Sequence, residues 1–425
     1  MAVEVLILLF FGMALVGVPI AYAIAGASIL YVVMTGTPWP VVGQRMIAGA
    51  DSFPLLAAPL FMLAGAIMNG GGIMARLLRL ADAMIGHVRG GLAQVNVLSS
   101  LLMAGMSGSA TADAAGQGAT MIPAMKKSGY PAPMSAVVTS ASSVIGPIFP
   151  PSVPFVIYGS VAQVSIGQLF IAGIVPGLIM TGFLILTVYI MSRRGNYRTR
   201  ERFEPGEFFV ALRHAALDLM LPVIIVGGIV GGIFTPVEAA AIAVFYALLL
   251  EMVIFRQLAP GALLPIVLGA ARLTAMIMFV IAVSNLFGWI LVREGFGQML
   301  ADALLSISSD PVVLRCLVVV LLLVLGLLIE TVVLIVLIVP ILLTLSPQLM
   351  MDPVHLGVTV VFSTMLGLIT PPVGLCMFLV NAIAGISVAT YTRAILPYFI
   401  ALICCAFVIA LVPPLTTWLP QLLMR

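Results

Sequence analysis

Two proline pairs have the residue types and spacing that point most directly to chemistry. They end the related segments GPIFPP at residues 146–151 and GLITPP at residues 367–372. Proline removes an amide donor and clashes with the carbonyl of the preceding turn, so each segment is expected to interrupt a helix. The carbonyls released there are hard oxygen ligands suited to sodium, while the exposed amide ends of the half-helices favour a carboxylate. The segments therefore predict two cation sites near an anion site.

Each predicted ion site combines one interrupted helix with hydroxyl and glycine residues from another part of the chain. Backbone carbonyls are expected to supply much of the coordination. The residues predicted around the first ion are Ser107, Ser109, Gly146, Phe149 and Pro150. Those predicted around the second ion are Gly326, Thr331, Gly367, Thr370 and Val373. The alternative is that the interruptions serve only helix packing.

Two acids, Asp113 and Glu330, lie close to these predicted sites. An acid in an apolar segment is a functional candidate, because leaving it unpaired in a membrane costs at least a few kcal/mol. It could support an ion, take a proton or cap a helix, and capping is an equally good interpretation. Together with nearby hydroxyls these acids are the predicted substrate contacts, which are Thr111, Asp113, Ser143, Glu330, Thr331 and Thr364.

The composition defines the environment in which these residues must be held. Of 425 residues 63% are apolar and 8% are charged, whereas about a quarter of the residues of a soluble domain are charged. Residues 5–44 and 128–192 contain no Asp, Glu, Lys or Arg, so several bilayer crossings of about 20 residues fit there. We expect a polytopic, all-α membrane protein. The net charge of +3 is not gathered in a basic stripe, which argues against a nucleic-acid surface.

The four cysteines lie inside apolar segments without metal-binding spacing, so no metal other than sodium and no cofactor is expected. The three histidines, His87, His214 and His355, fall near the ends of apolar runs and are interpreted as interfacial residues.

A basic cluster at residues 193–202 sets the expected topology. The positive-inside rule places it in the cytoplasm, and counting back along the chain puts both ends of residues 91–125 on one side of the membrane. A re-entrant helical hairpin with its tip at residues 105–113 explains that arrangement, because unwound backbone at membrane depth must line an enclosed cavity. Two straight helices packed through small residues are the alternative.

An internal duplication connects the two halves. Pro19, Asp113 and Pro123 match Pro236, Glu330 and Pro340 at a separation of 217 residues, while Ser142, Gly146, Pro150, Pro151 and Pro176 recur 221 residues later. The predicted first repeat is 1–200, with scaffold helices at about 4–70, a hairpin at 91–125, a broken helix at 134–158 and a helix at 169–191. The second is 201–425, with scaffold helices at about 217–292, a hairpin at 312–346, a broken helix at 354–379 and a helix at 395–412. The predicted topology inverts the repeats, which is an architecture of secondary transporters.

Amphipathic stretches precede both predicted hairpins. The first contains Arg76, Arg79, Asp82 and Arg89, and the second contains Arg293, Glu294 and Asp302. We interpret them as interfacial helices that link a mobile hairpin domain to a fixed frame.

Taken together, the motifs resemble the large membrane subunit of tripartite ATP-independent periplasmic (TRAP) transporters over nearly the whole chain. The resemblance rests on GVPIAYA at 17–23, SFPLL at 52–56, GGLAQVNV at 90–97, SGSATAD at 107–113, GGIFTPVEA at 231–239 and TPPVG at 370–374. It implies a fold like that of the ion transporter superfamily and an elevator mechanism, in which the hairpin domain carries solute past a fixed scaffold. It also implies that a sodium gradient, and not ATP, drives import across the bacterial inner membrane.

The same resemblance implies two partners. One is a small membrane subunit of about four helices, expected as a separate polypeptide because the sequence carries no such extension. The other is a soluble periplasmic protein that delivers a carboxylate-bearing solute. Substrates of the family include C4-dicarboxylates, sialic acid and other organic acids.

Other functions remain open at this point. A stand-alone sodium and dicarboxylate symporter has the same hairpins without needing a binding protein. A passive channel is disfavoured, because hairpins from opposite faces close a site at both ends. GMSG at residues 105–108 matches a nucleophile motif of intramembrane serine proteases, but no histidine is placed to act as its base.

Overall fold

The computed structural model describes residues 2–194, 197 and 202–424. The described part is 83% helix and contains no strand, which confirms the all-α expectation. Part of the basic cluster used for the topology prediction, Arg198, Arg200 and Glu201, lies outside the described residues.

The first half of the chain consists of ten α-helices and a short 3₁₀ turn at Phe53–Leu56. In chain order the helices are α1 (Ala2–Leu15), α2 (Ile20–Thr35), α3 (Trp39–Ala50), α4 (Ala57–Gly70), α5 (Ile73–Ile85), α6 (Leu92–Ser107), α7 (Ala110–Lys127), α8 (Ala132–Ser143), α9 (Val153–Ala162) and α10 (Ile166–Met191).

The second half begins with three scaffold helices, α11 (Pro205–Val230), α12 (Pro236–Leu248) and α13 (Pro260–Arg293). A π-helical turn, η3 (Leu249–Ile254), extends α12. The remaining elements are α14 (Phe296–Ile307), α15 (Pro311–Leu328), α16 (Thr331–Leu349), α17 (Pro353–Met365), the 3₁₀ turn η4 (Leu366–Ile369), α18 (Leu375–Ala384), α19 (Val388–Leu411) and α20 (Pro414–Leu423).

Eight helical segments of the described chain are long and apolar enough to cross a membrane. They include α4 with its preceding turn, α10, α11, α12 with η3, α13, α15, α16 and α19. The chain is therefore a multi-pass membrane protein. Neither α6 nor α7 is among these segments, since α6 is shorter and α7 carries the basic pair Lys126 and Lys127 near its end.

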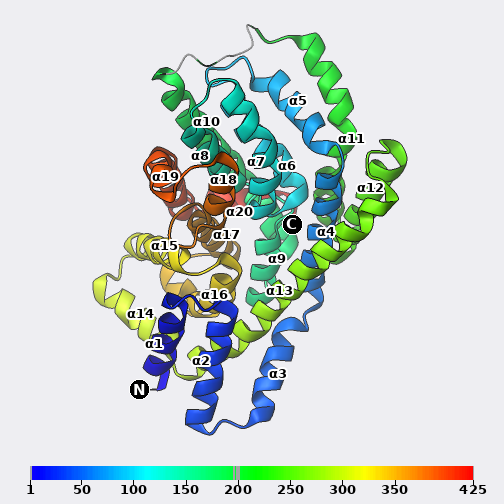
Figure 1. Ribbon diagram of the computed structural model, residues 1–425. Coiled ribbons are helices and arrows are strands. Elements are labelled where there is room, and N and C mark those ends of the chain that lie inside the picture. The colour runs from blue at the N-terminus through cyan, green and yellow to red at the C-terminus, as the bar shows by residue number, and fades with distance from the viewer. Residues whose placement is uncertain (1, 195–196, 198–201, 425) are drawn as a thin grey trace.

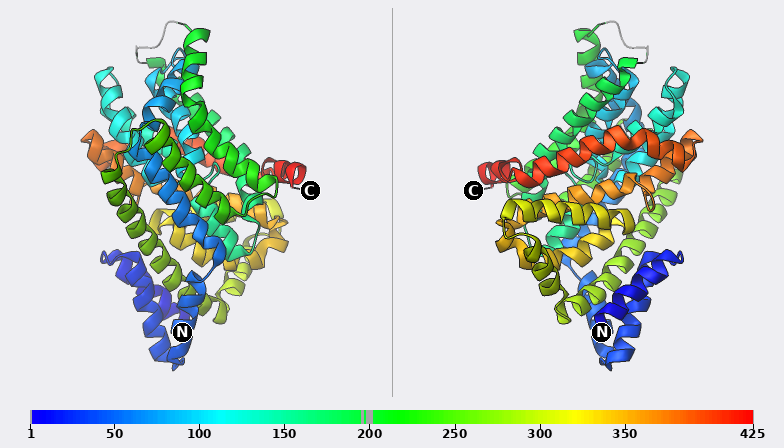
Figure 2. Two further views of the ribbon diagram at one scale, coloured as in Figure 1. Left: turned by 90° about the vertical axis from the view of Figure 1, so that its right-hand side faces the viewer. Right: turned by 90° about the vertical axis from the view of Figure 1, so that its left-hand side faces the viewer.

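The halves are interleaved in space. Helix α3 packs against α13, and α4 packs against α12, which forms a frame along one side of the molecule. Between this frame and the helices of the opposite side, α7 packs against α18 and α16 packs against α9, so each half supplies a helix to the other (Figure 1). The two side views show α1, α2 and α3 gathered at one end (Figure 2).

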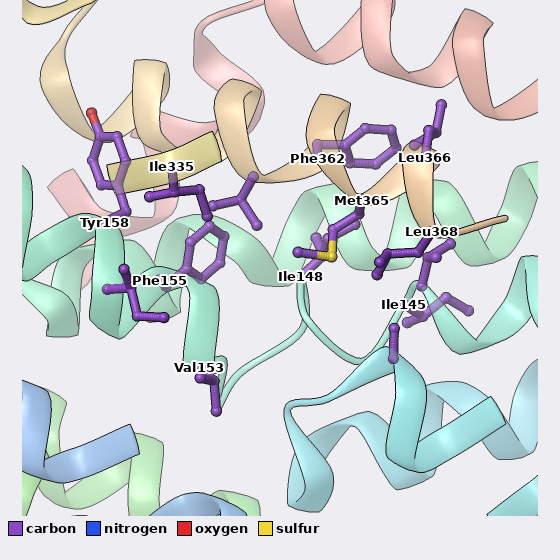
Figure 3. Packing of buried hydrophobic residues seen from close by; sticks show 14 of the residues in the cluster. Ile145, Ile148, Val153, Phe155, Tyr158, Ile335, Phe362, Met365, Leu366 and Leu368 are labelled. Atoms are coloured by element: carbon purple, nitrogen blue, oxygen red, sulfur yellow. The ribbon is translucent and has the colours of Figure 1, made fainter. Parts of the chain in front are cut away.

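Large apolar side chains fill the contact between α9, α16 and α17. Tyr158, Phe155 and Ile335 meet there, while Ile148 lies beside Met365 and Leu368 (Figure 3). The Tyr158 hydroxyl leaves this apolar contact to donate a hydrogen bond to the Pro353 carbonyl at 2.7 Å. These contacts hold the two interrupted helices against each other near the middle of the molecule.

Candidate functional site

The first hairpin turns over only two residues between α6 and α7. Gly108 adopts φ +57°, a conformation that L side chains rarely adopt, and Ser109 caps α7 by accepting a hydrogen bond from the Ala112 amide at 3.4 Å. A Cβ added at Gly108 would lie 2.6 Å from the Pro151 carbonyl oxygen. The hairpin tip therefore touches the proline pair through bare backbone.

The helix formed by α8 and α9 is interrupted at residues 144–152. Its Pro150–Pro151 peptide bond is cis, and Ser152 restarts the helix by accepting from the Phe155 amide at 3.2 Å. Of the residues predicted for the first ion, Ser107 and Ser109 lie at the hairpin tip, while Gly146 and Pro150 lie in this interruption. The Phe149 ring packs against Gly177 of α10.

Asp113 lies between the tip and the interruption. Its carboxylate is buried, has no hydrogen-bond partner among the described residues, and lies beside the Ser107 hydroxyl. A Cβ on Gly146 would be 2.5 Å from its Oδ2 atom. The site thus brings a carboxylate, a hydroxyl and the backbone of an interrupted helix together within a buried space.

The second hairpin meets the second interruption even more closely. A Cβ on Gly367 would lie 1.8 Å from the Gly326 carbonyl oxygen, and one on Gly326 would lie 3.2 Å from that of Thr364. Thr331, the first residue of α16, directs its hydroxyl toward the Thr364 carbonyl at 3.4 Å. Gly326, Thr331 and Gly367 are therefore brought together.

The two remaining residues predicted for the second ion lie further along the interruption. Thr370 donates to the Leu366 carbonyl at 3.1 Å. Val373 lies in the turn between the cis Pro371–Pro372 bond and α18. Both belong to the segment where helical hydrogen bonding is broken.

The pairing of Asp113 with Glu330 is corrected by the helix starts. Glu330 is the N-cap of α16 and accepts from the amides of Val332 at 2.9 Å and Val333 at 3.2 Å. The N-cap of α7 is Ser109, one turn before Asp113. The residue in the position of Glu330 is therefore Ser109, at a separation of 221, because the four-residue difference in spacing already exists at the hairpin tip. Of the two acids, Glu330 caps a helix and Asp113 has no such role.

The predicted substrate hydroxyls differ in their freedom to act. Ser143 donates to the Ser140 carbonyl at 2.8 Å and Thr364 to the Val360 carbonyl at 2.9 Å. Thr111 lies 3.2 Å from the Ser109 hydroxyl at the first tip. Ser143 and Thr364 already hydrogen-bond within their own helices, so Thr111 is the most available of the three.

Tyr391 was missed by the sequence reasoning and connects the two interruptions. Its hydroxyl lies 2.6 Å from that of Ser140 on α8 and donates to the Ile369 carbonyl in η4 at 3.1 Å. Cys376 of α18, interpreted from sequence as a packing residue, lies beside Ser143. Neither residue carries a motif, and only the packing of α18 and α19 against α8 brings them there.

A buried polar cluster fastens the first hairpin to α8. Asn96 donates to Thr139 at 2.7 Å, and Ser100 donates to Gln117 at 2.7 Å and to Ser142 at 2.8 Å. Gln117 also donates to the Asn96 carbonyl at 2.8 Å and to Ser99. The second hairpin is instead apolar along α15 and α16, so the two hairpins are held by different forces.

Arg76 joins α5 to the frame and is not a simple interfacial residue. Its guanidinium donates to both Asp218 oxygens at 2.6 and 2.9 Å, to Glu251 at 2.6 Å and to Gln257 at 2.7 Å. Both acid side chains are fully buried, and the Phe255 ring centroid lies 3.8 Å from the guanidinium carbon. This network ties α5 to α11 and to the turn after α12.

His355 corrects another interpretation. It is buried rather than interfacial, with Nδ1 2.8 Å from the Thr416 hydroxyl and Nε2 3.2 Å from the Ala410 carbonyl oxygen. The histidine packs α17 against the α19–α20 junction, a contact that position along the sequence does not reveal.

Comparison with known proteins decides the family. The model of the tripartite ATP-independent periplasmic transporter, DctM component, matches residues 7–415. The chain belongs to this family. It is 39% identical over 412 residues to the sialic acid TRAP transporter large permease protein SiaM of Vibrio cholerae, covering 97% of this chain and 96% of that protein. Membership in the TRAP family excludes the intramembrane protease interpretation, because these proteins are permeases and not enzymes.

Other comparisons extend the same relationship. The C4-dicarboxylate TRAP transporter large permease protein DctM of Vibrio cholerae is 36% identical, with 100% of this chain and 98% of that protein covered. Among solved structures, the YdaH transporter of Alcanivorax borkumensis aligns with a TM-score of 0.62 at 15% identity, covering 87% of this chain and 86% of that one. That likeness concerns the fold alone. The TRAP family assignment rests on the sequence relatives.

Proposed function

We propose that this TRAP large permease imports a small organic anion across the bacterial inner membrane, coupled to sodium and supplied by a periplasmic binding protein. The observation that carries the proposal is the pairing of each hairpin tip with one interrupted helix. Gly108 approaches the Pro151 carbonyl, and Gly326 approaches Gly367. Each pairing gathers backbone oxygens of the kind that bind sodium, next to helix N-termini that favour a carboxylate.

An inverted repeat accounts for the recurrence of these elements. Helices α6 and α15 end at Ser107 and Leu328, α7 and α16 begin at Ala110 and Thr331, and α8 and α17 begin at Ala132 and Pro353, each 221 residues apart. In the proposed arrangement the halves 1–200 and 201–425 have opposite orientations in the membrane. The hairpins and interrupted helices move as one body past a frame of α1–α4 and α11–α13.

The proposed sodium ligands are the residues predicted from the sequence, with a shift of emphasis. Ser107, Ser109, Gly146, Phe149 and Pro150 would serve the first ion, and Gly326, Thr331, Gly367, Thr370 and Val373 the second. The position of Asp113 beside Gly146 favours a role for its charge at the first ion, since an anion there lowers the cost of holding a cation. Thr111 is the hydroxyl proposed to contact substrate.

The substrate class and partners follow from the relatives. SiaM is named for sialic acid and DctM for C4-dicarboxylates, which are both carboxylate-bearing. The family description is of a tripartite periplasmic transporter. We therefore propose a small membrane subunit and a periplasmic binding protein as partners, and an organic acid as solute.

Uptake into proteoliposomes tests this function. Vesicles would contain the chain with its small subunit, with or without an inward sodium gradient, and each candidate binding protein would be added in turn. Uptake that needs both the gradient and a binding protein is the expected result. Uptake with sodium alone would make the chain a stand-alone symporter, and flux independent of the gradient would contradict a coupled carrier.

A further inference from the structure

One face of α13 is apolar, exposed and centred on a charge. Leu264, Leu268, Met276 and Phe279 are spaced three or four residues from Arg272 or from one another, so they share one side of the helix. All four are exposed, Met276 at 66%. We call these residues with Arg272 the α13 face.

Arg272 cannot be explained as an interfacial residue. It is exposed and makes no hydrogen bond or ion pair with the part of the chain that the structure describes. It lies twelve residues after Pro260, about 18 Å along the helix axis from the start of α13. Arginines that extend to the membrane surface lie near helix ends, whereas one in the apolar part of a span requires a partner charge.

Small residues beside this face favour a helix over lipid as the occupant. Gly261 and Gly269 have nothing within 4 Å of an added Cβ, and Ala271 and Ala275 are exposed. Small side chains let the backbones of two membrane helices approach closely, which favours helix association. The surface therefore offers both a close-packing track and a fixed charge.

We propose that the α13 face is the docking site of the small membrane subunit, through a transmembrane helix that places an aspartate or glutamate opposite Arg272. The inference rests on the proposed function, because it takes that subunit as the partner. The charge selects the partner: an apolar helix would leave Arg272 unpaired, and an acidic helix without Arg272 would bury its own unpaired charge.

Co-purification tests the docking site. The affinity-tagged chain would be co-expressed with its small subunit and isolated in mild detergent as wild type, Arg272→Lys and Arg272→Glu. We expect Arg272→Lys to retain the subunit and Arg272→Glu to lose at least tenfold. Arg393→Glu is the matched control, since Arg393 is an exposed arginine on α19, and it should change nothing. Changing the opposing acid of the subunit to lysine should restore binding to Arg272→Glu.

A photo-crosslinking amino acid provides a readout that does not depend on altering Arg272. At Met276 it should join the chain to the small subunit, and at the exposed Ile400 of α19 it should not. Lipid adducts alone at Met276, or an Arg272→Glu variant that keeps the subunit, would overturn the docking inference while leaving the tripartite function intact. A wild-type chain that retains no small subunit would overturn both the docking site and the proposed partner.

Discussion

At the scale of single residues, the two ion sites use the same backbone approach and different side chains. Glycines at the tips and interruptions allow carbonyls to come within contact distance, and this is common to both halves. The acids are not equivalent, because Glu330 is used by the amides of Val332 and Val333 while Asp113 keeps both oxygens free of hydrogen bonds.

Replacing Gly367 by alanine should abolish uptake. The added Cβ would lie 1.8 Å from the Gly326 carbonyl oxygen, so the second hairpin tip must move away from the interrupted helix. Sodium-driven uptake in proteoliposomes should fall at least about tenfold, equivalent to about 1.4 kcal/mol. Gly182→Ala is the control, since nothing lies within 4 Å of a Cβ there. Equal uptake by both variants would remove Gly367 from the site.

Asp113→Asn should weaken sodium binding more than Glu330→Gln. Removing the Asp113 charge leaves the first ion without its proposed counter-charge, and we expect the sodium concentration for half-maximal uptake to rise about tenfold or more. The glutamine oxygen can still accept from Val332 and Val333, so the α16 cap should persist. Sodium titration of uptake measures both, and an unchanged requirement in Asp113→Asn would contradict its role.

At the scale of elements, α5 is the part of the first half that is most firmly attached to the frame. The Arg76 network needs Gly71 and Gly72, because a Cβ on either would collide with the Glu251 or Gln257 side chain. Fixing α5 in this way leaves the glycine-containing segment between α5 and α6 as the connection to the first hairpin.

Arg76→Lys should destabilise the protein, while Arg79→Lys should not. Lysine cannot satisfy Asp218 bidentately and reach Glu251 as well, so at least one fully buried carboxylate loses its partner, which costs about 3 kcal/mol. Arg79 pairs with Glu207 at a more exposed position, where such pairs contribute less than about 1 kcal/mol. Thermal unfolding in detergent compares the variants. Similar melting temperatures would show that the network contributes little.

The elements that sequence could predict are those with local signals. Gly146, Pro150, Gly367 and Pro371 interrupt helices by their own chemistry, so the interruptions were predictable. The first turn of α7 was not, because the run of Gly, Ser, Ala and Thr before Asp113 has no unique helix start; the misassigned start produced the incorrect pairing with Glu330.

Contacts between distant helices have no local signal. Arg76 with Asp218, and Tyr391 with Ser140, join positions more than a hundred residues apart. His355 gave a misleading signal, because its place near the start of an apolar run suggested an interface. Its partners lie on α19 and α20, which only the folded chain brings near.

At the scale of the whole molecule, the proposed mechanism requires α9 to move relative to the frame. The two bodies meet where the Ser52 hydroxyl, just before the Phe53–Leu56 turn, lies 2.7 Å from that of Ser160 on α9. This distance allows the contact to be converted into a covalent link.

A disulfide between Ser52→Cys and Ser160→Cys should stop uptake reversibly. Made in a chain whose four native cysteines are replaced, the oxidised double variant should lose at least about 90% of its uptake, because the crosslink holds α9 to the frame. Reduction should restore it, and neither single variant should respond to oxidant. Full activity in the crosslinked protein would rule out this movement of α9.

The contrast between the hairpins also has a consequence for biogenesis. Helices α15 and α16 are apolar enough to partition into the bilayer as they leave the ribosome, whereas α6 and α7 are not among the spanning segments. The amides and hydroxyls of Asn96, Ser100 and Gln117 find part of their hydrogen bonding only on α8, at Thr139 and Ser142. The first hairpin can therefore settle in the membrane only after α8 has been synthesised, which makes insertion of the amino-terminal half a late, cooperative step.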